Sequence, residues 1–230
     1  MGSPPTMVAK MRTNIVRAAR PEDSGGCAAT TVAITLGVRS DPLVKSRVEL
    51  VEAWFELWDA ACARDEQEAV RHTWRQCQSR LLLGTAAAQR WRQVYGPMAA
   101  VQAALSDAGW SPCAPDVWRD QRGKEWAVQC GDKNHSLVDA LVGDLEAQLW
   151  RKAGLHEDGR GMEDGVDLDA SLVLLRRLAK AGGQYRGMLE AILTGAMRTN
   201  ERKERCMHHA GIYPVCTRCG AGVPDTLMHQ

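Results

Sequence analysis

From residue 41 onward, apolar side chains recur at steps of three and four residues, the spacing of one face of an amphipathic helix. Asp41 followed by Pro42 is a typical helix start, because an aspartate side chain caps free N–H groups and proline suits the first helical position. We therefore expect a helix from here to about residue 62. Its apolar face consists of Val44, Val48, Val51, Phe55, Trp58 and Cys62.

Three more helices are expected before residue 110. Each ends at a glycine, the residue that tolerates the left-handed backbone of many helix C-termini. They span about 65–84, 85–96 and 97–109, the last with Pro97 at its first position. In the first of these helices, the apolar positions that share one face are Val70, Trp74, Cys77 and Leu81.

A change of rhythm after residue 110 predicts a β-hairpin at about 115–129. Two short apolar segments, Val117–Trp118 and Trp126–Val128, flank a polar stretch that contains Gly123. After the hairpin, Ser136 is expected to cap another helix. The buried face of that helix is marked by Leu137, Leu141, Leu145 and Leu149.

The chain is expected to divide into four parts and to be mainly α in fold class. Residues 1–40 are predicted to form a weakly ordered leader with a short strand at 32–38, and residues 41–152 a helical bundle that includes the hairpin. Residues 153–169 combine four glycines with six acids, which is typical of a solvated linker. Residues 170–230 hold basic helices and a metal-binding segment.

The composition is that of an ordinary soluble globular protein, with 25% charged and 45% hydrophobic residues and a net charge of +1. No run of 18 apolar residues occurs, so neither a transmembrane helix nor a membrane partner is expected. The eight cysteines are scattered and follow no secretory signal, which favours a reducing compartment. We expect an intracellular protein, nuclear or cytoplasmic, without a targeting signal in its leader.

The strongest chemical signal is a C-x-x-C-G motif at residues 216–220, because two cysteines at this spacing can hold one metal ion from a single tight turn. A structural zinc site needs four ligands, and with His229 this order supplies three. The fourth comes from upstream or, if the chain is a fragment, from beyond its end. A redox C-x-x-C is disfavoured because a poor helix start follows the motif. The predicted zinc ligands are Cys216, Cys219 and His229, with His208 and Cys206 as candidates for the fourth.

The segment before this motif is basic. Residues 171–206 carry eight bases against three acids, a formal charge of +5, on helices expected at 169–181, 184–196 and 198–207. Such helices bind phosphates, or they are solvated faces of amphipathic helices, and the sequence leaves both interpretations open. The candidate phosphate-binding residues are Arg198, Arg202, Lys203 and Arg205.

The C-terminal segment also resembles a known family. A helix ending in Thr194-Gly195, a basic helix, the C-x-x-C-G motif, Asp225-Thr226 and then His229 resemble the zinc-binding segment of non-LTR retrotransposon reverse transcriptase polyproteins. The final cysteine of that pattern is absent here. Residues 91–118 are more loosely similar to the connecting region that follows the polymerase core in such elements.

The resemblance implies a fragment of a polyprotein that would be an RNA-directed DNA polymerase. It implies that the polymerase acids lie upstream and the ribonuclease H acids downstream, so this piece is expected not to be an enzyme. Its expected role is to hold RNA or DNA beside the polymerase core of the same polyprotein. The alternative is a helical protein-interaction scaffold whose end is stapled by a structural zinc. The sequence leaves open the preference for RNA or DNA and the oligomeric state.

Overall fold

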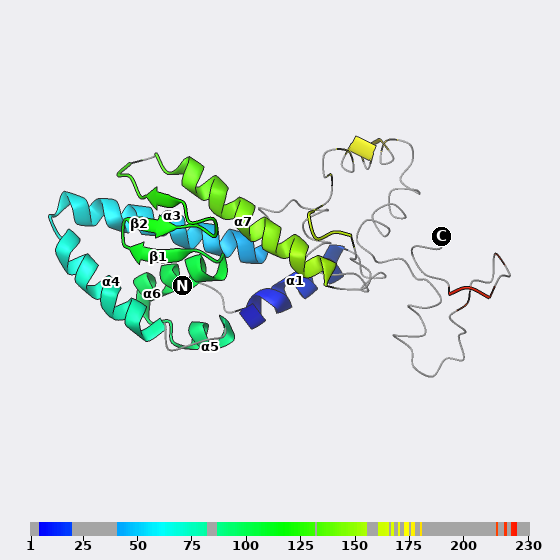
Figure 1. Cartoon of the computed structure of the whole chain (residues 1–230), viewed down its shortest axis with the longest axis horizontal. Helices are drawn as coiled ribbons and strands as arrows, with labels where there is room; N and C mark the ends of the chain where they lie inside the picture. Colours follow the sequence, from blue (N-terminus) through cyan, green and yellow to red (C-terminus); the bar gives the residue numbers. More distant parts are fainter. Residues whose placement is uncertain are drawn as a thin grey trace. The chain divides into compact units, whose positions relative to one another are not determined.

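The computed structural model describes residues 5–19, 41–81, 87–131 and 133–155, and beyond these only residues 161–165, 167, 170, 173–174, 176–177, 180, 215, 219 and 222–224. The described part is mainly helical with one small antiparallel sheet (Figure 1), which confirms the expected fold class at that level. The helices are α1 Pro5–Ala19, α3 Pro42–Ala63, α4 Gln67–Leu81, α5 Ala87–Arg92, α6 Gly96–Asp107 and α7 His135–Gly154. The strands are β1 Ser111–Ala114, β2 Val117–Arg119 and β3 Glu125–Ala127.

The chain divides into two compact units, one of residues 1–14 and 37–149 and the other of residues 15–36 and 150–230. The division falls within α7, and this helix continues to Gly154, into the segment predicted to be a linker. In the second unit, Gly165 has a φ of +95°, and a Cβ placed there would lie 3.3 Å from the indole of Trp150. At this point the predicted linker passes close to a side chain of α7, while Glu163 and Asp164 beside it are exposed.

Helix α3 begins where the sequence predicts. The Asp41 carboxylate accepts hydrogen bonds from the backbone N–H groups of Leu43 at 2.8 Å and Val44 at 3.4 Å, which is the geometry of an N-cap. The buried face is rotated slightly from the predicted one, because Trp54 rather than Phe55 is fully buried. The buried residues of α3 are Pro42, Val44, Arg47, Val51, Trp54, Trp58 and Ala61.

The core of the first unit is built around tryptophans from separate elements. Trp54 of α3 and Trp74 of α4 lie with their ring centroids 4.9 Å apart, and Trp118 of β2 stacks on Phe55 at 5.9 Å. Burial of an indole leaves its N–H group in need of a partner. Trp54 Nε1 meets this need by donating to the carbonyl of Pro115 at 2.9 Å, which joins α3 to the turn between β1 and β2.

The predicted hairpin is confirmed, and a third strand joins it. The sheet order is β1-β2-β3, with Trp118 opposite Trp126 in the hairpin. In the turn, the Asp120 carboxylate accepts from Trp126 Nε1 at 3.0 Å as well as from two backbone N–H groups, and these bonds lower its pKa, the Trp126 bond most of all. The sequence did not predict strand β1. Its Pro112 has no backbone N–H group to donate, which argues against a strand in the interior of a sheet, and β1 indeed lies at the edge.

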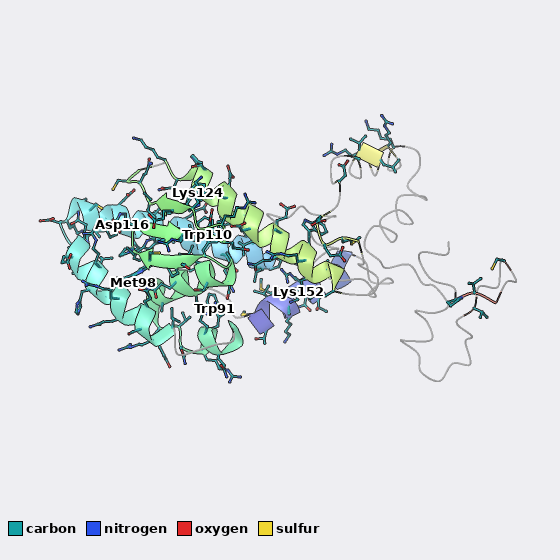
Figure 2. All side chains as sticks on the ribbon, in the orientation of Figure 1. Trp91, Met98, Trp110, Asp116, Lys124 and Lys152 are labelled. Atoms are coloured by element: carbon teal, nitrogen blue, oxygen red, sulfur yellow. The ribbon has the colours of Figure 1, made fainter. Side chains whose placement is uncertain are left out.

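Helix α7 begins at His135, one residue before the predicted cap Ser136. The reason is Asn134, whose carbonyl accepts the first helical hydrogen bond, from Val138 N at 3.1 Å. The predicted leucine face of α7 is confirmed, since all four of its leucines are buried. Trp110, labelled in Figure 2, immediately precedes β1 and donates from Nε1 to the Asp144 carboxylate of α7 at 2.7 Å.

Helix α1 differs from the weakly ordered leader that the sequence predicts. Val8 on this helix is buried, and the Arg12 guanidinium forms a bidentate pair with the Asp41 carboxylate, with both N–O distances 2.6 Å. This buried ion pair attaches α1 to the N-terminus of α3. The strand predicted at 32–38 lies outside the described residues, as do residues 85–86 of the helix predicted at 85–96, and α5 covers residues 87–92 of that helix.

Asp107, at the end of α6, joins three helices. Its carboxylate accepts from Arg47 of α3, with Nη2 2.8 Å away, and from Arg90 and Trp91 of α5, at 3.3 Å and 2.7 Å. Arg47 is completely buried, and its guanidinium lies 4.1 Å from the Trp91 ring centroid. Burial lowers the pKa of Arg47, and the Asp107 charge offsets part of that effect.

Candidate functional site

Most of the residues predicted to bind zinc lie outside the part of the chain that the structure describes. Only Cys219 is described, and it is exposed. Around it, Val215 and Pro224 form an antiparallel bridge that closes a loop containing both cysteines of the motif, and Gly222 has a φ of +70°. Within the described residues, no group of three or more metal-ligating side chains is found. The predicted ligands outside these residues are Cys216, His229, His208 and Cys206.

The predicted phosphate-binding residues Arg198, Arg202, Lys203 and Arg205 also lie outside the described residues. The same basic segment begins, however, with three described and exposed bases. These are Arg176, Arg177 and Lys180.

The structure shows a second group of exposed bases, on the solvent-facing sides of α4. This helix carries three arginines and one glutamate, a formal charge of +2, and all four are exposed. Side chains ending in nitrogen point outward along α4 in Figure 2. Sequence reasoning missed these bases, although a signal was present. Residues 69–106 contain five arginines and not a single acid.

Two of the α4 arginines differ in how firmly they are held. Arg71 pairs with Asp116 at 3.0 Å and lies over the Trp58 ring, 5.8 Å from its centroid. Arg75 forms an exposed pair with Glu68 at 3.3 Å and donates from Nε to the Arg71 carbonyl at 3.3 Å, and the Arg75 and Glu68 side chains are 67% and 79% exposed. Exposed pairs of this kind contribute little to stability and exchange easily for another anion. Arg75, together with the exposed Arg80, is therefore available to an incoming phosphate.

An acidic pocket lies between α3 and the start of α7. It has a volume of about 310 Å³ and is lined on one side by three carboxylates of α3, with Phe55 among them. The opposite side is formed by Gly131, Asn134, Val138 and His135, the last at the first position of α7. Carboxylates repel phosphate, so this pocket and the α4 bases suit ligands of opposite charge. The three carboxylates belong to Glu52, Glu56 and Asp59.

A pair of thiols stands beside this pocket. Cys62 follows Asp59 on α3 by one turn, and it is the neighbour that most raises the pKa of Cys130. Cys62, burial and the nearby Asp59 carboxylate together raise the pKa of Cys130 to about 11. The sequence pattern placed Cys62 on a buried helix face and gave no reason to connect it with Cys130.

Comparison with known proteins gives no family for this chain: no family model, no curated protein and no solved structure matches it. Among the residues that the structure describes, no helix has the length and apolar character needed to span a membrane.

Proposed function

We propose that this chain is the connecting and zinc-binding region of a retroelement reverse transcriptase, which binds RNA or DNA through phosphates and leaves catalysis to other parts of the polyprotein. The observation that carries the proposal is the C-x-x-C-G motif followed by His229, set behind a basic segment. The Val215–Pro224 bridge supports it, because a zinc-binding turn of this type is closed by backbone pairing on both sides of the cysteines.

Helix α4 gives the proposal a second support from the described residues. Its arginines are exposed and lie on one helix, where Arg71 pairs with the half-buried Asp116 and Arg75 with the exposed Glu68. Exposed guanidinium groups are suited to the phosphates of a nucleic-acid backbone, which carry no sequence information. Binding is therefore expected to be independent of sequence and to weaken steeply as salt increases.

In the proposed site, Cys216, Cys219 and His229 hold a structural zinc, and His208 or Cys206 completes the set in the absence of a further cysteine. Zinc supplies a cross-link that fixes the turn and the basic helix before it. The phosphates are bound by basic side chains and not by the zinc. The candidate phosphate ligands are Arg198, Arg202, Lys203 and Arg205 together with Arg75 and Arg80 of α4.

The test is a measurement of zinc content and nucleic-acid binding on the full chain. We expect the chain to bind zinc and to bind single-stranded RNA and DNA oligonucleotides with micromolar-class affinity at low salt. Cys216→Ser should lower the bound zinc and weaken nucleic-acid binding together. The matched control is Cys77→Ser on α4, which should change neither quantity.

Two results would contradict the proposal. Unchanged zinc stoichiometry in Cys216→Ser would remove the metal site, and an absence of salt-dependent binding would remove the nucleic-acid role. In the second case the protein-interaction scaffold becomes the better account, because a scaffold needs no phosphate contacts.

A further inference from the structure

The β2–β3 hairpin carries a half-buried tryptophan whose ring is held in a fixed orientation. Trp126 lies on β3, opposite the fully buried Trp118 of β2. Its indole stacks on the buried Trp110, with ring centroids 6.0 Å apart and an angle of 18° between the ring planes. Its Nε1 donates to the Asp120 carboxylate at 3.0 Å. The strand pairing, the ring stack and the hydrogen bond together fix the plane of this indole.

An exposed lysine lies over the same indole. The ammonium of Lys124, a residue labelled in Figure 2, is 3.5 Å from the Trp126 ring centroid, which is a cation–π contact. Lys124 is exposed, and it forms no ion pair with any residue that the structure describes. A cation–π contact is weak at an exposed position, and a long lysine side chain changes its conformation easily. A flat aromatic ligand can therefore take the place of the ammonium over the ring.

The turn of the hairpin adds positive charge beside the ring. Arg122 and Lys124 are both exposed, and within the described part of the chain neither has an ion-pair partner. The Asp120 carboxylate is occupied by other donors, since it accepts from the backbone N–H groups of Arg122 at 2.8 Å and Lys124 at 3.0 Å as well as from Trp126. The turn thus presents two cationic side chains next to one fixed indole.

We propose that Trp126 is a stacking platform for one base of a single-stranded RNA or DNA, and that Lys124 and Arg122 bind the phosphates beside that base. The inference rests on the function proposed above and names the form of nucleic acid that the hairpin binds. On binding, Lys124 leaves the ring for a phosphate, and the base takes its place on the indole. A duplex does not bind in this way, because its bases are already stacked and paired.

The exchange of partners is favourable for both groups. The Lys124 ammonium exchanges the weak attraction of an aromatic ring for the full negative charge of a phosphate. The base gains a flat apolar surface, and every base has such a surface, so the sequence of the strand matters little. Because Trp110 and Asp120 already hold the indole, little ordering of the protein is needed when the base binds.

The experiment compares two single-stranded probes on the full chain by fluorescence anisotropy. One is an oligothymidylate, and the other is an abasic oligomer of equal length, which has the same phosphates and no bases. The wild-type chain should bind the oligothymidylate roughly tenfold more tightly at equal salt. Trp126→Leu should remove most of this difference and leave the binding of the abasic oligomer unchanged. Trp126→Phe keeps an aromatic ring and should keep most of the difference.

The role of the lysine is tested with the same probes. Lys124→Ala should weaken the binding of both and flatten the salt dependence by about 0.7, because one phosphate contact is lost from a single strand. The matched control is Lys45→Ala, which removes an exposed lysine of α3 and should keep the wild-type slope.

A measurement on the wild-type chain alone applies even if the Trp126 variants fail to fold. Ultraviolet light couples 5-iodouracil covalently to an aromatic side chain on which it stacks. A single strand that carries this base should therefore become attached mainly to the tryptic peptide of residues 125–133, whose sole aromatic residue is Trp126.

The possible failures separate this inference from the proposed function. Equal wild-type affinities for the two probes, or attachment confined to other peptides, would overturn the stacking platform while salt-dependent binding still supports the phosphate contacts. An absence of salt-dependent binding to both probes would overturn the platform and the nucleic-acid role together.

Discussion

Arginine plays opposite parts in two regions of this molecule: the junction of α3, α5 and α6, and the solvent-facing sides of α4. At the junction, Arg47 is fully buried and donates to Asp107 from Nε at 3.2 Å and from Nη2 at 2.8 Å. On α4, Arg75 is 67% exposed and its pair with Glu68 is longer, at 3.3 Å. The residue type is the same in both places, and the burial of the charge decides its role.

The difference follows from the cost of taking a charge out of water. A buried guanidinium has lost its hydration and is tolerable only while its carboxylate partner and its hydrogen bonds remain. An exposed guanidinium keeps its hydration, so its pairing is weak and its partner can be replaced by a phosphate. The junction is therefore where substitutions should unfold the protein, and α4 is where they should change binding alone.

The largest expected effect is that of Asp107→Ala. It removes the carboxylate shared by Arg47, Arg90 and Trp91 and leaves a buried charge without compensation. We expect a loss of roughly 3–5 kcal/mol in the free energy of unfolding, measured by urea denaturation. Glu49→Ala serves as the control, because the Lys45–Glu49 pair is 3.9 Å apart and exposed, and its loss should cost about 0.5 kcal/mol or less.

A smaller effect is expected at Asp41, which both caps α3 and pairs with Arg12. Asp41→Ala removes the cap and the charge, whereas Asp41→Asn keeps a side-chain oxygen for the cap. The alanine variant should therefore be less stable than the asparagine variant by about 1 kcal/mol, the usual contribution of an N-cap. Equal stabilities in urea denaturation would show that the cap contributes nothing beyond the ion pair.

The smallest effect on stability is expected for the double variant Arg75→Ala, Arg80→Ala. Both side chains are exposed on α4, so their removal should change the free energy of unfolding by no more than about 0.5 kcal/mol. Thermal and urea unfolding of the variant would check this. A loss comparable to that of Asp107→Ala would show that these arginines support the fold and would remove the contrast between the two regions.

The sequence predicted the elements whose signals are local. The Asp41-Pro42 start of α3, the leucine face of α7 and the hairpin around Gly123 all depend on residues close together in the chain. It missed β1, which is short and contains a proline, and it missed α1, whose apolar residues Val8, Met11 and Ile15 recur at helical spacing but which is held by a contact with a distant residue. The bidentate pair between Arg12 and Asp41 is such a contact.

The candidate sites, like the elements, could be predicted only where their residues lie close together in the sequence. The C-x-x-C-G motif is visible in the sequence because both cysteines sit in one turn, although most of its ligands lie outside the described residues. The acidic pocket arises only when the segment before α7 folds against α3, as the hydrogen bond from Gly131 N to Asp59 Oδ2 shows. No spacing rule connects residues so far apart in the sequence, so sequence reasoning did not find this pocket.

The central claim, that exposed arginines of this chain hold nucleic-acid phosphates, is tested most directly by the salt dependence of binding to duplex DNA. The logarithm of the binding constant should fall linearly with the logarithm of salt concentration, and each lost phosphate contact should flatten the slope by about 0.9. We predict a flattening of about 2 for Arg75→Ala, Arg80→Ala and of roughly 2–3 for Arg198→Ala, Arg202→Ala, Arg205→Ala. The control Lys45→Ala, Lys152→Ala removes two exposed charges elsewhere and should keep the wild-type slope. Wild-type slopes in both arginine variants would contradict the claim.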